Sequence, residues 1–61
     1  MFSEKECAER MIERYGKDAG VHCTYNLMQY DRGSVGFDYW WSVGEFIRLI
    51  SLSTARSALA A

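Results

Sequence analysis

Residues 3–15 place their apolar side chains on one face of a helix and their charged side chains on the other. Ser3 and Glu6 match a capping box, in which the serine hydroxyl accepts from the Glu6 N–H and the glutamate reaches back to the serine N–H. Gly16 stands where a residue in the left-handed conformation commonly ends a helix. The pattern predicts an amphipathic helix over residues 3–15, with an apolar face made of Cys7, Ala8, Met11, Ile12 and Tyr15.

Residues 18–31 follow two periodicities at once, one typical of a helix and one typical of a half-buried strand. The helical stripe contains Ala19, Cys23, Leu27 and Tyr30, and the alternating set contains Val21, Cys23, Tyr25 and Leu27. Asp18 is a suitable N-cap for a helix, and residues 31–34 have the composition of a turn. We therefore expect a second helix over residues 18–31, with a strand as the alternative.

Residues 34–52 form the most apolar segment of the chain and contain both tryptophans. Ser34 is a good N-cap, and one helical face runs without a breaker through Phe37, Trp40, Trp41, Gly44 and Ile47. The residues from Val35 to Val43 also alternate in a way that suits the second strand of a hairpin. The sequence predicts an all-α fold of three helices, with a helix–β-hairpin–helix arrangement of the α+β class as the alternative.

Two short segments, residues 11–19 (MIERYGKDA) and 39–47 (YWWSVGEFI), resemble a group of short uncharacterised helical proteins common in alphaproteobacteria. In that group a helix ends before a glycine, an Asp-Ala pair opens a second helix, and a later helix carries Trp, Val and Ile at positions i, i+3 and i+7. Trp40, Val43 and Ile47 match this spacing. The resemblance implies a helical fold and a bacterial origin, and it implies no activity.

The chain has 61 residues, so we expect one domain over residues 1–61, with residues 53–61 as a fraying helix end or a loose tail. We expect its core to contain Met11, Ile12, Tyr15, Trp40, Trp41, Val43 and Ile47. The third helix is apolar most of the way round, and two short helices cannot cover every side of it. The surplus apolar residues therefore predict a partner-binding surface made of Tyr39, Phe46, Leu49 and Ile50.

Charge and cysteine content narrow the possible functions. The formal net charge is -1, so no strong field attracts nucleic acid or anionic lipid. The segment that follows the glycine corner, residues 19–30, has no Lys or Arg, although that corner is similar to a helix-turn-helix. No leader segment and no membrane span are indicated, and two cysteines are too few for a secreted disulfide scaffold, so we expect a cytoplasmic protein.

Cys7, His22 and Cys23 are the candidate metal ligands and nucleophiles. A structural zinc site takes four ligands at characteristic spacing, and this set offers three, two of them adjacent. Nucleophilic catalysis needs a third orienting residue, which the pattern does not indicate. We expect no metal, no cofactor and no enzymatic activity.

The sequence therefore predicts a small non-catalytic protein–protein interaction or assembly module. Its partner would be a second copy, giving a homo-oligomer, or a larger protein, docked on the third helix. The alternative is a small nucleic-acid-associated regulator. The last residues, Leu59, Ala60 and Ala61, are similar to the end of a bacterial degradation tag, with an ordinary alanine-rich helix end as the competing interpretation.

Overall fold

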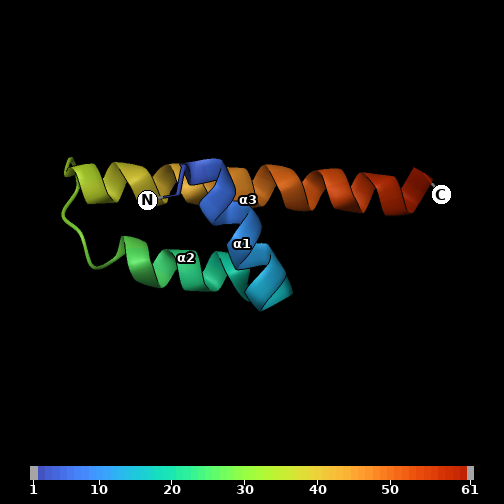
Figure 1. The fold of residues 1–61 in the computed structure, drawn as a ribbon, viewed down its shortest axis with the longest axis horizontal. Coiled ribbons are helices and arrows are strands. Elements are labelled where there is room, and N and C mark those ends of the chain that lie inside the picture. Colours follow the sequence, from blue (N-terminus) through green and yellow to red (C-terminus); the bar gives the residue numbers. More distant parts are fainter. Residues whose placement is uncertain (1, 61) are drawn as a thin grey trace.

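The computed structural model describes residues 2–60 of the backbone and the side chains of residues 2–54. Helix α1 spans Glu4–Tyr15, the 3-10 turn η1 spans Gly16–Asp18, α2 spans Ala19–Leu27 and α3 spans Val35–Ala60. Residues 2–60 contain no strand, so the predicted all-α class is confirmed and the β-hairpin alternative is wrong. Because α1, η1 and α2 follow one another without a gap, the first half of the chain is one helical run bent at Gly16 (Figure 1).

The N-terminus of α1 is capped by Ser3, as predicted. The Ser3 hydroxyl accepts a hydrogen bond from the Glu6 N–H at 3.2 Å. The carboxylate half of the capping box differs from the expectation, because Glu6 accepts from the Ser3 hydroxyl at 3.3 Å. This cap fixes where the amphipathic face of α1 begins.

A sharp corner at Gly16 separates α1 from α2. Gly16 has φ 58° and ψ −127°, and its N–H bonds to the carbonyl of Ile12. A side chain is strongly disfavoured in this part of backbone space, which explains the glycine. The corner turns α2 so that α1 and α2 both reach α3 (Figure 1).

Helix α2 ends at Leu27, four residues earlier than the predicted end at Asp31. The N–H groups of Gln29 and Tyr30 bond to carbonyls only three residues back, which tightens the chain out of the α-helix. The Tyr30 ring then lies directly on the backbone of Gly36, where an added Cβ would collide with it. Residues 28–34 thereby form the loop that returns the chain alongside α2.

Helix α3 is the longest element and forms the long axis of the molecule. The Ser34 hydroxyl caps its start by accepting from the Phe37 N–H at 3.1 Å. The 26 residues of α3 are about 39 Å long at 1.5 Å per residue, which matches the 41 Å length of the molecule. Helices α1 and α2 lie against its N-terminal part, and its C-terminal part projects beyond both (Figure 1).

The third helix is predicted over residues 34–52 with an extension as an option, and α3 continues to Ala60. The composition changes after Leu52, but no glycine or proline follows Gly44 to break the helix. The degradation signal proposed for Leu59, Ala60 and Ala61 lies outside the residues whose side chains are described.

The core is small and lies where the three helices meet. Its buried members are Ala8, Met11, Ala19, Cys23, Val43 and Ile47. Val43 is the largest side chain that is completely buried. Within the described part of the chain, no helix has both the length and the apolar character needed to cross a membrane.

Candidate functional site

Trp41 is the clearest departure from the predicted core, because 56% of it is exposed. The predicted core residues Met11, Val43 and Ile47 are buried, and Ile12 and Trp40 are half-buried against them. With about 100° per residue, Trp40 lies about 60° from Val43 around the helix and Trp41 about 160° from it. Two adjacent tryptophans therefore have different environments, one at the edge of the core and one largely exposed on α3.

Tyr15 is also predicted to lie in the core, but 36% of it is exposed. Its ring stacks on the imidazole of His22, with 3.7 Å between the ring centroids. The chain turns away at Gly16 immediately after Tyr15, which leaves the ring on the outside of the corner.

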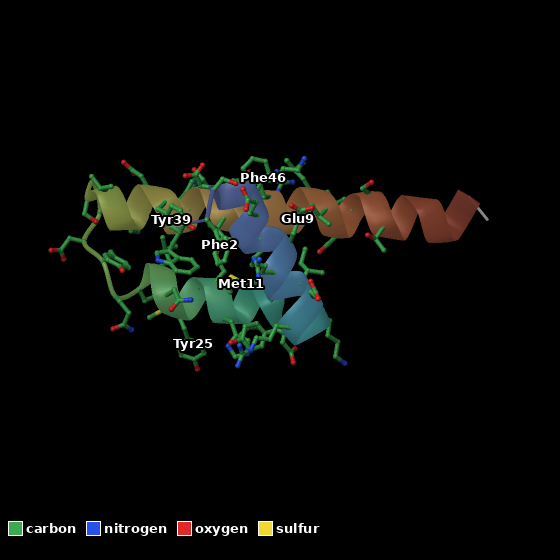
Figure 2. All side chains as sticks on the ribbon, viewed as in Figure 1. Phe2, Glu9, Met11, Tyr25, Tyr39 and Phe46 are labelled. Atoms are coloured by element: carbon green, nitrogen blue, oxygen red, sulfur yellow. The ribbon has the colours of Figure 1, made fainter. Side chains whose placement is uncertain are left out.

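The predicted partner-binding residues do not form one open surface. Tyr39, Phe46 and Ile50 are half-buried and pack against the core, and only Leu49 is largely exposed. The Tyr39 hydroxyl donates to the carbonyl of Phe2 at 2.9 Å, which ties the chain ahead of α1 to α3 (Figure 2). These three side chains are partly covered because the N-terminal segment and α1 pack against this flank of α3, and their role in binding a partner stays a prediction.

One open flank of α3 lies beside α2, where the two helices form a hollow of about 260 Å³. We call it the α2–α3 groove. It is lined by Gly20, Cys23, Thr24, Leu27, Trp40, Trp41, Gly44 and Glu45. The exposed Trp41 indole and two glycines, one from each helix, thus meet at one surface feature.

Apolar side chains continue beyond the groove. Phe37 stacks with Trp41 at 6.1 Å between ring centroids. Val21 on α2 and Met28, immediately after its end, are exposed. The one formally charged residue in the lining, Glu45, pairs with Arg48 at 3.1 Å. The groove therefore suits an apolar occupant and lacks the clustered Lys and Arg that a phosphate backbone requires.

Cys7, His22 and Cys23 do not assemble a site of the kind that binds a metal, and residues 2–54 contain no group of three or more potential ligands that does. The Cys23 thiol is buried and donates to the Trp40 carbonyl at 3.2 Å. Burial raises the pKa of the Cys23 thiol, and the neighbouring Cys7 adds to the effect. A buried thiol with a raised pKa is a poor nucleophile.

The phenol of Tyr39 provides a test of how the N-terminal segment and α1 are held on α3. Burial, with smaller contributions from the neighbouring Cys7, Glu4 and Glu6, raises the pKa of Tyr39 from 10.0 to about 12. Because the folded state favours the protonated phenol, its contribution to stability is complete below pH 10 and is lost as the pH rises towards 12. We expect the free energy of unfolding to fall across this range, measured by urea denaturation at stepped pH.

Substituting Tyr39→Phe removes the ionisation, so its stability should fall less steeply over the same range. The variant also loses the hydrogen bond to Phe2, worth about 1 kcal/mol at neutral pH. Tyr25→Phe is the matched control, since Tyr25 is 65% exposed and points away from α3 (Figure 2). Identical pH profiles for wild type and Tyr39→Phe would contradict a burial effect at this phenol.

Comparison of the chain with protein-family models, with curated proteins and with solved structures found no match. The resemblance to short helical bacterial proteins therefore stays a prediction from its motifs. The candidate site rests on the geometry of the groove alone.

Sequence reasoning missed the contribution of α2 to this surface. Gly20 and Thr24 lie one turn apart on the groove side of α2, opposite Gly44 on α3. A glycine inside a helix without a packing reason is the signal that could have pointed to them.

Proposed function

We propose that this protein is a small, non-catalytic, three-helix interaction module that self-associates through α3 and the helix surface beside it. The proposal keeps the class of function that the sequence predicts. It moves the contact surface from the flank of α3 that α1 covers to the flank left open beside α2.

The observation that carries the proposal is the accessible surface of the chain. It measures 4906 Å² for a mass of 7.0 kDa. A compact monomer of this mass exposes about 4,000 Å², so the chain carries about 900 Å² more than expected. A standard stable interface buries about 800 Å² per partner. The excess is similar to the area that one partner buries in such an interface, and the part of α3 that projects beyond α1 and α2 contributes to it.

The small core supports the same conclusion. Six buried residues, two of them alanines, form the apolar centre of the fold. Domains of this size are usually stabilised by disulfides, metals, unusually good packing or oligomerisation. Both cysteines are free, and no metal-binding group occurs among the described residues. Association is a source of stabilisation that the exposed apolar surface can provide.

Charge favours a second copy of the chain over a highly charged partner. The formal net charge is -1, so two copies repel each other weakly. The exposed side chains around the groove are mainly apolar, and Glu45 is neutralised by Arg48. The apolar surface of one copy therefore meets a chemically similar surface on the other.

Sedimentation equilibrium over a wide concentration range tests this function. We expect the weight-average mass to rise from one chain towards two as concentration increases, with little dependence on salt because the contact is apolar. A single-chain mass at every concentration would contradict self-association. In that case the hypothesis would be limited to an interaction with a different protein.

A further inference from the structure

We propose that two copies of this chain pack through their α2–α3 grooves about a two-fold axis, with Trp41 of each copy filling the groove of the other. This inference rests on the proposed self-association and adds the contact surface and the residue that anchors it. The occupant of the groove is therefore an indole from a second copy.

The groove has the size and chemistry that an indole needs. Its volume is about 260 Å³, and a cavity of about 150 Å³ already accommodates a benzene ring. Leu27, Thr24 and the two glycines provide a mostly apolar lining. Trp41, at 56% exposed, is a large aromatic side chain without cover in a single chain. Tryptophan is also the residue type most enriched among the energetic anchors of protein interfaces.

The two glycines of the groove have no role that a single chain explains. Gly20 and Gly44 lie within helices and have ordinary helical φ values. A Cβ added at Gly20 would meet nothing within 4 Å, and one at Gly44 would meet only Cys23 Sγ at 3.5 Å, an ordinary contact. Alanine would fit at both positions and would favour the helix. Close approach of another molecule accounts for the missing side chains.

The arrangement is self-complementary, which a two-fold dimer requires. Trp41 projects from α3 within one turn of Gly44 on the same helix, so each chain carries the inserted side chain beside the hollow that receives one. In a two-fold contact the same patch is used by both copies, and every contact occurs twice. The ring of Phe37, which is half-buried and stacks on Trp41, adds apolar area at the same place.

Substituting Trp41→Ala should weaken the dimer by at least about 30-fold in dissociation constant, the effect expected of an interface anchor. Leu49→Ala is the matched control, because Leu49 is 52% exposed on the same helix but lies outside the groove. It should leave the dissociation constant within about 3-fold of wild type, as contacts outside the anchor contribute little. Sedimentation equilibrium gives both values, and circular dichroism shows that each variant is folded.

A second variant separates a lost contact from a damaged fold. Gly20→Leu fills the groove from within the chain, where its Cβ meets no neighbour. We expect a higher melting temperature for the dilute single chain and loss of the dimer at concentrations where wild type associates. A variant with a damaged fold would instead show a lower melting temperature together with the loss of the dimer.

The outcomes distinguish the two proposals. A wild-type chain that stays single at every concentration overturns both the self-association and this contact. A wild-type dimer that survives Trp41→Ala and Gly20→Leu overturns this contact and leaves self-association in place. Dissociation by Leu49→Ala would also overturn it, because the dimer would then depend on a residue of α3 outside the groove.

Discussion

Replacing Ile47 by alanine is expected to destabilise the fold by about 3 kcal/mol, the middle of the range for truncating a buried Ile. Ile47 is 6% exposed and is one of only six buried residues in the described chain. A domain of 61 residues has a total stability of about 3–9 kcal/mol. A single cavity in this core therefore removes a third or more of the stability, and at the lower bound the variant is unfolded at 25 °C.

Urea denaturation at low protein concentration measures this change without a contribution from association. Leu49→Ala serves as the control, because it removes a similar aliphatic volume two positions further along α3, from a residue that is 52% exposed. We expect its cost to stay below about 1 kcal/mol. Equal costs for the two variants would show that the Ile47 side chain is not held in a packed core.

Replacing Gly16 by alanine is the second change with a large expected effect, about 2–3 kcal/mol. Gly16 combines φ 58° with ψ −127°, and this pair of angles is far outside the regions that a residue with a Cβ adopts easily. No neighbouring atom lies within 4 Å of an added Cβ, so the cost comes from the backbone and not from a collision. The corner also sets the angle between α1 and α2, both of which contribute to the core.

Gly20→Ala is the matched control for this prediction, since it makes the same substitution four residues later inside α2. It should stabilise the dilute single chain by about 0.5–1 kcal/mol, because alanine favours the helix and its Cβ has free space. Opposite signs for the two variants in urea denaturation are the expected result. A neutral Gly16→Ala would mean that the corner has a different backbone conformation.

Local signals in the sequence were enough to predict the all-α class and several element boundaries. Ser3 and Ser34 have the side-chain acceptors that helix N-termini need, and Gly16 has the freedom that the corner needs. These interactions involve residues within four positions of each other, so they are visible without knowing the tertiary structure. The end of α2 was missed because it depends on the contact of Tyr30 with Gly36 across the loop.

The exposed apolar surface of α3 could not be located from the sequence, because it depends on which sides of α3 the other helices cover. The apolar residues of α3 surround most of the helix, so periodicity does not distinguish Tyr39 and Phe46 from Trp41. The N-terminal segment and α1 pack on the flank of Tyr39 and Phe46, and the corner at Gly16 places α2 beside Gly44. Only the directions of α1 and α2 show that Trp41 is the aromatic residue of α3 that stays largely exposed.

The length of α3 beyond its neighbours gives one helix two different local stabilities. Around Val43 and Ile47, the backbone amides can exchange with solvent deuterium only when the packed core opens. In residues 51–54 every side chain is exposed, and an amide there exchanges once a few helical hydrogen bonds break. Exchange rates along this single helix should therefore decrease from residues 51–54 towards Val43. A dimer contact at Trp41 would protect amides at the core end of this range.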